Sequence, residues 1–558
     1  MRDWNNGVMG RISGARAVVE VLREENIRHV FHLPGSQIID ILDEIYQSSI
    51  RAIMTRHEQG AAFMADGYAR ATRGAGVCLA TVGPGAVNLV SGIAASYKAS
   101  VPVIAITGVH DQKLLERDSF HEIDQVGLFK PITKWSTSIN QAEKVPEMVR
   151  KAFRVALTGR RGPVHLAIPS NVSAAEVDFQ GSSPSRYRTA IPAACPEDFA
   201  DEVLRLLGQS KFPVIFAGGE VLWSRAGTDL VQLAEALQIP AVTTRDHPDA
   251  FPNKHPLGMG MVGKGRGEAG NRTMQRADLI LALGAKFDYQ STRYGFDIIP
   301  EKAKIIHVSI NPEEVGRVYP IELGMVCDVG PVVKALLYHV RKKALNFGLA
   351  KELEHIKLES QKKRDSEIDR VSLPLQPQAI VRTLRDHLPP ETIVVVDGGN
   401  FAKHVRRHFD FFENDTFHYP DDFGSVGSSF PMALGVKLAR PERPVVCLTG
   451  DGGLLLNCQE LETAIREKIS VMVVVFNDFG FGNVRAYQKE KFEGRFMCDF
   501  DNPPFGELAR LFKADGAQVN TLDELKEAVR TGLTCEKPYV IDVTMSREEL
   551  QKPGFLSE

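Results

Sequence analysis

The chain has 558 residues, which at roughly 100–200 residues per domain corresponds to about three domains. Hydrophobic residues make up 43% and charged residues 25%, a composition that argues against a disordered, collagen-like or disulfide-scaffold protein. The 67 Lys and Arg residues nearly balance the 70 Asp and Glu residues, so the net charge of −3 gives no overall attraction for nucleic acid or an anionic membrane.

The apolar runs and the cysteines indicate a cellular compartment. The longest runs, 101–107 and 469–476, are far shorter than the roughly 20 residues that span a bilayer. The first residues contain no apolar segment of the signal-peptide type, and the seven cysteines form no Cys-x-x-Cys pair. We therefore expect a cytoplasmic protein with reduced thiols that binds neither a membrane nor nucleic acid.

Short apolar runs alternate with amphipathic stretches along the chain, which is the pattern of βα units in parallel sheets. The strands that we expect are 29–31, 77–81, 103–107, 164–168, 214–217, 279–283, 304–308, 393–396, 445–448, 471–476 and 539–543. The helical patterns between them include 14–25, 61–72, 229–237 and 522–533.

Two stretches interrupt this alternation. One is rich in Ser and Pro, at 178–196. The other lies around 341–377, where a strongly charged segment is followed by LPLQPQ. They divide the chain into predicted domains 1–180, 190–345 and 370–558, each with an α/β fold built on a doubly wound parallel sheet. A glycine motif that follows a strand and opens a helix occurs in both the first and the third domain, so we expect these two domains to share a fold.

The motif with the clearest chemistry lies in the third domain. Gly450-Asp451-Gly452 follows one predicted strand, and Asn477-Asp478 follows the next. Glycines let a phosphate approach the backbone, and a helix start adds N–H donors and a favourable dipole. Because an aspartate there would repel a diphosphate unless a cation lay between them, we interpret Asp451, Asp478 and a backbone carbonyl near Gly480 as ligands of Mg²⁺ or Ca²⁺. An ordinary Gly-Asp turn is the alternative.

This arrangement resembles the motif of the thiamine diphosphate-dependent enzymes, and the resemblance extends over most of the chain. It implies a pyrimidine-binding first domain, a central domain and a diphosphate-binding third domain. The segment 56–62 resembles the site of the family's catalytic glutamate, which nominates Glu58. The resemblance implies that Glu58 hydrogen-bonds to the pyrimidine ring of thiamine diphosphate and so promotes the proton transfer that activates the cofactor.

The same resemblance nominates the remaining cofactor contacts. Gly424 and Val426 belong to the loop that would hold the cofactor bent, with Val426 smaller than the Met, Leu or Ile that is frequent there. Asn400 lies in a loop that would reach the diphosphate from the other side, although 397–400 also fits a plain turn at a strand end. The other implied cofactor-binding residues are Pro34, Gly83, Asn88, Gly450, Gly452, Gly453 and Phe481.

Within this family the segments 57–61, 118–122 and 283–288 resemble the large subunit of acetolactate synthase (acetohydroxyacid synthase). That resemblance implies decarboxylation of a 2-oxoacid and transfer of the remaining unit to a second one. It also implies a homodimer or homotetramer whose active sites lie between subunits. The alternative is a thiamine-dependent 2-oxoacid decarboxylase or C–C lyase that acts on a more polar substrate.

Departures from the synthase pattern keep that alternative open. His121 replaces the usual Gln and is interpreted either as a proton shuttle or as a structural histidine. Asn483 and Tyr487 replace Met and Trp, which makes the expected substrate pocket more polar. Arg485 is predicted either to hold a substrate carboxylate or to face solvent.

Two further candidates and one further cofactor come from the same comparison of motifs. Ser36 stands where benzoylformate-decarboxylase-like members have an active-site serine, and with its neighbour Gln37 it completes the predicted catalytic residues. The central domain of acetolactate synthases binds FAD, and 218–219 keeps part of that pattern. Charged or polar residues at 245–246 and 289–290 depart from it, so FAD is an alternative cofactor of the central domain and its absence is the favoured interpretation.

Overall fold

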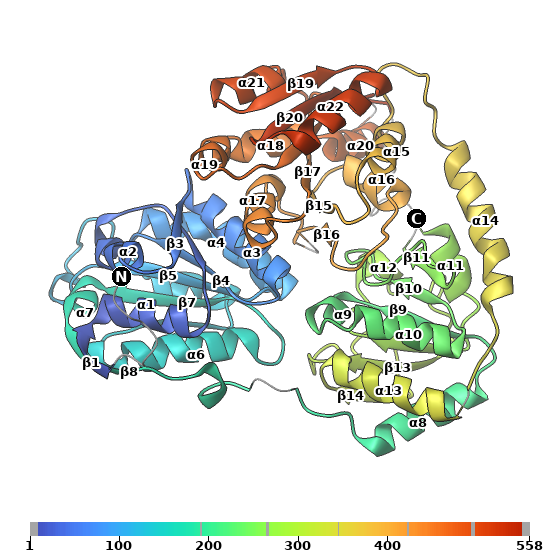
Figure 1. The fold of residues 1–558 in the computed structure, drawn as a ribbon, viewed down its shortest axis with the longest axis horizontal. Helices are drawn as coiled ribbons and strands as arrows, with labels where there is room; N and C mark the ends of the chain where they lie inside the picture. Colours follow the sequence, from blue (N-terminus) through green and yellow to red (C-terminus); the bar gives the residue numbers. More distant parts are fainter. Residues whose placement is uncertain are drawn as a thin grey trace.

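A computed structural model of the chain describes residues 9–189, 192–263, 267–343, 345–420, 423–492 and 497–548. Within these residues, three six-stranded sheets, all parallel, are each covered by helices (Figure 1). A separate antiparallel pair joins β1 (Met9–Ser13) to β8 (Glu176–Gln180). The fold is therefore the predicted set of three doubly wound α/β domains. None of the helices in the described ranges combines the length and the apolarity that a membrane crossing requires.

The first sheet has the strand order β3-β2-β4-β5-β7-β6. Its strands are β2 (His29–His32), β3 (Arg51–Met54), β4 (Gly76–Ala80), β5 (Val103–Val109), β6 (Trp135–Ser138) and β7 (Val164–Pro169). One face packs on α1 (Gly14–Glu24), α2 (Ile39–Tyr46) and α6 (Val145–Leu157), with α7 (Ser170–Ala174) beside them. The other face packs on α3 (Glu58–Thr72), α4 (Pro84–Ala99) and α5 (Gln125–Phe129).

The central sheet has the order β11-β10-β9-β12-β13-β14. Its strands are β9 (Pro213–Ala217), β10 (Ala241–Thr243), β11 (Gly258–Met261), β12 (Leu279–Leu283), β13 (Lys304–Ser309) and β14 (Leu323–Val326). Its helices are α8 (Glu197–Gln209), α9 (Gly219–Trp223), α10 (Gly227–Leu237), α11 (Glu268–Met274), α12 (Tyr289–Thr292) and α13 (Val329–Lys343). The charged linker forms α14 (Ala350–Ser366), which runs along the outside of the molecule toward the third domain (Figure 1).

The third sheet has the order β16-β15-β17-β18-β20-β19. Its strands are β15 (Ile393–Val396), β16 (Phe417–His418), β17 (Val445–Gly450), β18 (Met472–Asn477), β19 (Asp515–Val519) and β20 (Tyr539–Thr544). Its helices are α15 (Pro377–His387), α16 (Phe401–His408), α17 (Ser429–Ala439), α18 (Asp451–Asn457), α19 (Glu460–Arg466), α20 (Gly482–Lys491), α21 (Phe505–Leu511) and α22 (Leu522–Thr534).

Strand order relates the domains to one another. When each six-stranded sheet is numbered by itself, the first and third both read 2-1-3-4-6-5, whereas the central sheet reads 3-2-1-4-5-6. The predicted common fold of the first and third domains is therefore confirmed. In sheets of this kind a ligand binds at the carboxyl edge where the strand order reverses. That point lies between β2 and β4 in the first domain and between β15 and β17 in the third.

The first and third domains share one hydrophobic core, in which α3 packs against α17 (Figure 1). Two glycines allow this close crossing. A Cβ added to Gly67 would lie 2.2 Å from the carbonyl oxygen of Met432, and one added to Gly435 would lie 2.0 Å from that of Met64. Any larger side chain would push the two helices apart, so glycine is required at both positions. The precise limits of the three domains remain predictions.

Candidate active site

A cavity of about 380 Å³ opens at the carboxyl edge of the third sheet, where β15 and β17 diverge. Its wall includes loops that follow β15, β17 and β18. The predicted residues that line it are Asn400, Gly424, Val426, Gly450, Asp451, Gly452, Gly453, Asp478, Gly480, Phe481, Asn483 and Tyr487. The fold therefore gathers at one place most of the positions that the motifs of the third domain nominated.

Asp451 is the first residue of α18, and its side chain is buried in this cavity wall. Its Oδ1 accepts a hydrogen bond from the backbone N–H of Gly452 at 2.8 Å. Its Oδ2 accepts one from the backbone N–H of Gly480 at 3.0 Å and one from the side-chain amide of Asn502 at 2.8 Å. Burial nevertheless raises the pKa of the Asp451 carboxyl. Both oxygens are held in place for a partner that carries positive charge.

Asp478 follows β18 and is buried beside Asp451. Burial, and then repulsion from the Asp451 carboxylate, raises the pKa of Asp478 to about 7. A divalent cation between the two carboxylates would remove this repulsion, and oxygen donors are the ligands that Mg²⁺ prefers. The described residues hold no cluster of three or more His, Cys, Asp or Glu side chains suited to a metal ion. The donor set of two buried carboxylates fits a cation that also contacts a diphosphate.

The loops around the cavity are joined by Asp397, which the motif analysis did not nominate. This buried carboxylate directly follows β15. It accepts hydrogen bonds from the backbone N–H of Gly427 at 2.9 Å and from the hydroxyls of Ser429 and Thr449, each at 3.1 Å. Burial raises the pKa of Asp397 to about 6. Asp397 therefore fixes the loop that contains Val426 against the ends of β15 and β17. Its position directly before two glycines was the signal in the sequence.

The first domain presents Glu58 at its own carboxyl edge. Glu58 is buried and is the first residue of α3. This helix begins three residues before the predicted one, because His57 caps it. The Nδ1 atom of His57 accepts a hydrogen bond from the backbone N–H of Gln59. The side-chain amide of Asn88 donates to Oε2 of Glu58 at 2.9 Å. A Cβ added to Gly85 would lie 3.2 Å from Oε1 of Glu58. These contacts fix the orientation of the carboxylate.

A buried carboxylate of the third domain holds the backbone just before Glu58. Glu460, the first residue of α19, accepts the backbone N–H of Arg56 at 3.1 Å. Burial raises the pKa of Glu460 to about 7. A Cβ added to Gly60 would lie 2.4 Å from the Oε1 atom of Glu460, so glycine is needed for this approach. No local pattern in the sequence indicates this contact, because 404 residues separate Arg56 from Glu460.

The other predicted residues of the first domain follow β2 and β4. Oε1 of Gln37 accepts hydrogen bonds from the hydroxyls of Ser36 at 2.9 Å and Thr81 at 2.7 Å. Pro34 is exposed beside them. His121 is exposed, with a φ of 69°, and its backbone carbonyl would lie 2.4 Å from a Cβ on Gly83.

The described residues that line the cavity come from the central and third domains, and Glu58 is not among them. Within one chain, the predicted residues therefore form two separate groups: those that line the cavity of the third domain, and those around Glu58 in the first domain.

Comparison with known proteins identifies the family. The chain matches "Thiamine pyrophosphate enzyme, N-terminal TPP binding domain" over residues 12–128, the corresponding central domain over 200–336 and the C-terminal TPP binding domain over 397–543. It is 34% identical over 557 residues to the "Probable acetolactate synthase large subunit" of Methanocaldococcus jannaschii, covering 96% of this chain and 93% of that protein. The chain belongs to the thiamine pyrophosphate enzymes.

Two further relatives of this thiamine pyrophosphate enzyme carry similar names. The "Acetolactate synthase large subunit" of Corynebacterium glutamicum is 35% identical over 96% of this chain and 87% of its own length. The "Acetolactate synthase isozyme 2 large subunit" of Escherichia coli is 31% identical over 96% of each chain.

Arg485 differs from the expectation. It is buried, and its guanidinium donates to Oδ2 of Asp478 at 2.8 Å and lies 2.7 Å from Oδ1 of Asp499. Two carboxylates engage this side chain on the metal side of the cavity, and Arg485 is not among the residues that line it. In this thiamine pyrophosphate enzyme Arg485 therefore does not face solvent, and its contacts make it a partner of Asp478. A role for Arg485 in binding substrate stays a prediction.

Three basic residues of the cavity wall were missed as site residues. Lys403 and Arg406 lie one turn apart on α16, and Arg245 follows β10 in the central domain. The amine of Lys403 donates to Oδ1 of Asn483 at 2.8 Å. The sequence analysis considered Arg245 only as a departure from a flavin pattern. The i, i+3 spacing of Lys403 and Arg406 on the helix that follows Asn400 was the available signal.

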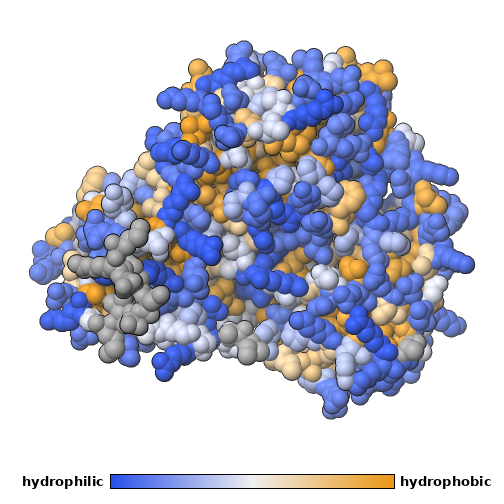
Figure 2. Space-filling view, in the orientation of Figure 1, coloured by the Kyte–Doolittle hydropathy of each residue, from blue (hydrophilic) through white to orange (hydrophobic). Residues whose placement is uncertain are grey.

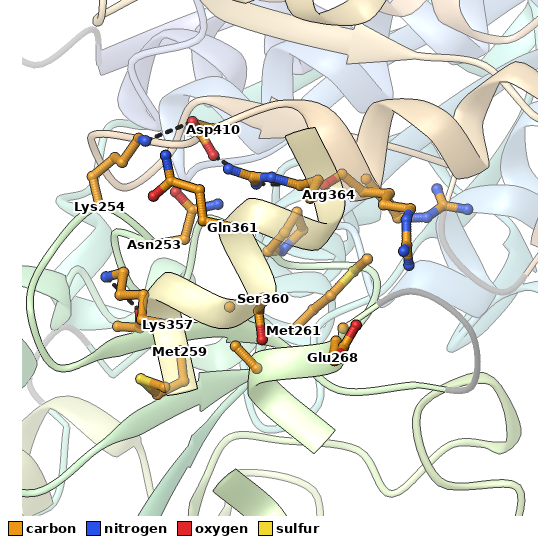
Figure 3. Close-up of a pocket in the computed structure, with 17 residues that line it drawn as sticks. Asn253, Lys254, Met259, Met261, Glu268, Lys357, Ser360, Gln361, Arg364 and Asp410 are labelled. Carbon is orange, nitrogen blue, oxygen red and sulfur yellow. Dashed lines mark hydrogen bonds and ion pairs between the residues drawn. The ribbon is translucent and has the colours of Figure 1, made fainter. Parts of the chain in front are cut away.

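A second cavity, of about 120 Å³, shares Arg406 with the first (Figure 3). Figure 3 shows Lys254 and Arg364 both pointing to Asp410, whose carboxylate they contact at 2.8 and 2.9 Å. Arg407 also lines this cavity and forms an ion pair with Glu367. These ion pairs connect the linker helix α14, a loop of the central domain and the third domain. The cations of this second cavity are thus engaged in holding the domains together.

Proposed function

We propose that this enzyme binds thiamine diphosphate through Mg²⁺ and catalyses the acetolactate synthase reaction, in which one 2-oxoacid is decarboxylated and the remaining unit is joined to a second 2-oxoacid. Asp451, Asp478 and the backbone carbonyl of Gly480 would hold the cation. The observation that carries this proposal is the pair of buried, mutually repelling carboxylates at the glycine-rich edge of the third sheet. The names of the curated relatives support the reaction type.

The remaining residues of the third domain would place the cofactor. The glycines 450, 452 and 453 leave room for the diphosphate beside the start of α18, with Asn400 and Phe481 on either side. The backbone carbonyl of Gly424 and the side chain of Val426 would keep the cofactor bent. Bound thiamine diphosphate supplies a carbon nucleophile and an electron sink for the bond that is broken next to the carbonyl group.

Glu58 would hold a proton against the pyrimidine ring, with Asn88 fixing its carboxylate and Pro34 and Gly83 lining the same edge. Because Glu58 does not line the cavity of its own chain, we propose that it serves the cofactor bound by a second copy. Ser36, Gln37 and His121 would then face the substrate from that copy. This arrangement requires a homodimer, alone or within a homotetramer.

The surface supports such a dimer. Large apolar side chains are exposed near the carboxyl edges of the first and third sheets. Exposed apolar area of this kind marks protein–protein interfaces. They are Ile39, Val87 and Phe120 in the first domain and Phe423, Leu455 and Leu456 in the third. Figure 2 shows apolar atoms gathered below the top of the molecule, in the region where Figure 1 places α17 and α18.

A second candidate function is a decarboxylase or C–C lyase that acts on a more polar substrate. The hydrogen bond between Lys403 and Asn483 favours it, because it places a cation and an amide at the position of an expected apolar contact. Tyr487 lines the same side of the cavity. Product analysis separates the two functions: acetolactate from pyruvate supports the synthase, whereas acetaldehyde alone supports the decarboxylase.

We propose that the central domain binds no flavin. At the switch point of its sheet, a Cβ on Gly219 would lie 2.4 Å from the His247 ring and one on Gly284 would lie 2.3 Å from Cβ of Glu220. Glu220 is partly buried there and accepts the hydroxyl of Ser309 at 2.6 Å. The His247 ring and the Glu220 side chain thus lie directly against these two glycines, where a pyrophosphate would approach. We expect purified protein to lack flavin absorbance near 450 nm.

The experiment that tests the proposed function is a thermal shift followed by turnover. Thiamine diphosphate with Mg²⁺ should raise the melting temperature in a concentration-dependent way, because a ligand that binds only the folded state stabilises it. EDTA should reverse the shift. The loaded protein should then convert pyruvate to acetolactate. Absence of both the shift and the turnover would reject the proposal. We place the enzyme in the cytoplasm on the basis of its composition and unpaired cysteines.

A further inference from the structure

Another cavity, of about 620 Å³, opens where the first and third domains meet on the side away from the active site. Its wall includes the start of β2 at His29, the start of β3 at Arg51 and residues 467–470, which precede β18. It therefore lies at the amino edges of both sheets, opposite the carboxyl edges that hold Glu58 and Asp451. Among the described residues, its wall contains none of the catalytic or cofactor-binding positions proposed above.

The wall of this rear cavity carries mostly positive charge. Its described residues include one carboxylate, Glu467, and four cationic side chains: Arg28, Arg51, Lys437 and Lys468. The pKa of His29 is lowered to about 4 by burial and by the charges of Arg51 and Arg28, so this ring is neutral near pH 7. Four positive charges thus face a single negative one.

The carboxylate of the wall has cationic partners of its own. The guanidinium of Arg51 donates to Oε2 and to the backbone carbonyl oxygen of Glu467, each at 2.8 Å. Arg466, which is not part of the wall, donates to Oε1 of the same carboxylate. These contacts join the first and third domains. Because two guanidinium groups already engage Glu467, it is not the counter-charge of the remaining cations.

The other three cations of the wall keep donors for a ligand. Arg28 and Lys468 are exposed, and their side chains form no hydrogen bond or ion pair with another residue that the structure describes. The amine of Lys437 donates to two backbone carbonyl oxygens in the turn after α17, each at 2.9 Å, and one of its three N–H groups remains. Glu442, outside the wall, offsets part of the charge of Lys437. The positive charge at Arg28 and Lys468 has no such counterpart among the described residues.

The end of α3 adds a neutral donor and does not repel an anion. Tyr68 is buried there, and its hydroxyl forms no hydrogen bond with another described residue. Burial raises the pKa of Tyr68, so the hydroxyl keeps its proton. Carbonyl groups at a helix end disfavour negative charge, but Arg225 donates to that of Thr72 at 3.1 Å and Arg440 to that of Ala71 at 3.0 Å.

We propose that the rear cavity binds a small anion with two or more phosphate groups, held by Arg28, Lys437 and Lys468. A phosphate group presents three strong acceptor oxygens, which suits donors that come from separate segments, whereas a carboxylate presents two in one plane. Arg28 belongs to the first domain and both lysines to the third, so the ligand bridges the two domains. This site is independent of the reaction that the enzyme catalyses.

Calorimetry on the full-length chain in EDTA, at constant ionic strength, tests this site. EDTA separates it from the cofactor site, where two carboxylates need a cation before a diphosphate binds, whereas the rear cavity supplies its own cations. The probes are inorganic phosphate, pyrophosphate, citrate and ADP. Pyrophosphate should bind at least about tenfold more tightly than phosphate and than citrate, which carries a similar charge. Tighter binding of ADP than of pyrophosphate identifies a nucleotide as the ligand, and weaker binding identifies an inorganic polyphosphate.

Arg28→Gln and Lys468→Gln should each weaken pyrophosphate binding at least about fivefold, because each removes a charged donor. Lys513→Gln is the matched control. Lys513 is also an exposed lysine of the third domain, with a φ of 68° where Lys468 has 55°, but it lies outside the wall, so its replacement should leave the affinity unchanged. Pyrophosphate should also raise the melting temperature of the metal-free protein, and the Arg28→Gln, Lys468→Gln double variant should lose this effect.

Three results would overturn the inference: equal affinities for pyrophosphate, phosphate and citrate, full pyrophosphate binding by the double variant, or an equal loss of binding in Lys513→Gln. The melting temperatures of the variants without ligand show whether they are folded. Because none of these measurements involves turnover, a protein that converts no 2-oxoacid but shows the expected binding would reject the proposed function and support the rear anion site.

Discussion

The first and third domains have the same strand order, yet they present different chemistry at the same edge of the sheet. The third domain has a cavity with two buried carboxylates that repel each other, so it is suited to a cation and a diphosphate. The first domain has one carboxylate, Glu58, held by Asn88 beside Gly85. The same fold is thus suited to binding a cation and a diphosphate in the third domain and to positioning a proton-transferring carboxylate in the first.

The difference between the two edges predicts that replacing Asp451 lowers cofactor affinity, whereas replacing Glu58 lowers turnover. The largest effect is expected for Asp451→Asn, because removing one partner of a buried pair of opposite charges, here the carboxylate that would hold the cation, costs about 3–5 kcal/mol, or roughly two to three and a half orders of magnitude in affinity. The affinity for thiamine diphosphate and Mg²⁺ should fall by that amount in calorimetry. Asp499→Asn, on the far side of Arg485, is the control and should bind the cofactor nearly normally.

Glu58→Gln should show the opposite pattern. Turnover should fall by about a hundredfold or more, because a general acid–base group is removed, while cofactor affinity should remain close to that of the wild type. Steady-state kinetics and calorimetry on the same preparation give both numbers. If this variant kept wild-type turnover, or if it lost the cofactor as Asp451→Asn does, the division of labour between the two domains would be wrong.

The contact between the two domains should make stability depend on pH. Burial raises the pKa of Glu460 from 4.5 to about 7, so the folded protein binds a proton between these values that the unfolded chain has lost. This contribution to stability is complete below pH 4.5 and is lost as the pH rises through 7, at a cost of about 3 kcal/mol. In Glu460→Gln, which keeps an acceptor for the Arg56 amide, that part of the pH dependence should disappear from urea unfolding curves. Identical pH dependence in both proteins would contradict this assignment.

The smallest effect concerns the shared core. Gly435→Val should lower the free energy of unfolding by about 1–3 kcal/mol, because the new side chain meets the backbone of α3. Gly208→Ala is the matched control: a Cβ at Gly208 meets nothing within 4 Å, so this change should be neutral or slightly stabilising. Equal stability of the two variants would show that α3 and α17 do not cross as closely as described.

The sequence predicted most of the strands that are buried on both faces, although it missed the buried internal strand β10, which is only three residues long. Runs such as 393–396 and 445–448 are continuous and apolar, and each is a central strand. Edge strands were not predicted, because they are short or half-exposed. Every residue of β6 is partly exposed, and β14 alternates between partly and fully exposed residues. Their registers depend on neighbouring strands that a local pattern does not reveal.

For the site, local motifs were sufficient where glycines and aspartates follow a strand directly, as at Asp451 and Asp478. They were insufficient where function depends on distant segments. Glu460 reaches Arg56 from the other end of the chain, and Arg245 meets Arg406 only because the central and third domains adjoin at Tyr419. The burial of Arg485 was missed for the same reason, since its partner Asp499 lies on a later loop.

A complementation experiment tests the central claim most directly. Glu58→Gln and Asp451→Asn chains, each inactive as a homodimer, are unfolded, mixed in equal amounts and refolded together with thiamine diphosphate and Mg²⁺. If each site takes Glu58 from one chain and Asp451 from the other, mixed dimers contain one intact site, and about a quarter of all sites should recover wild-type turnover. If mixing restores no activity while refolded wild type is fully active, both carboxylates act within one chain and the account is contradicted.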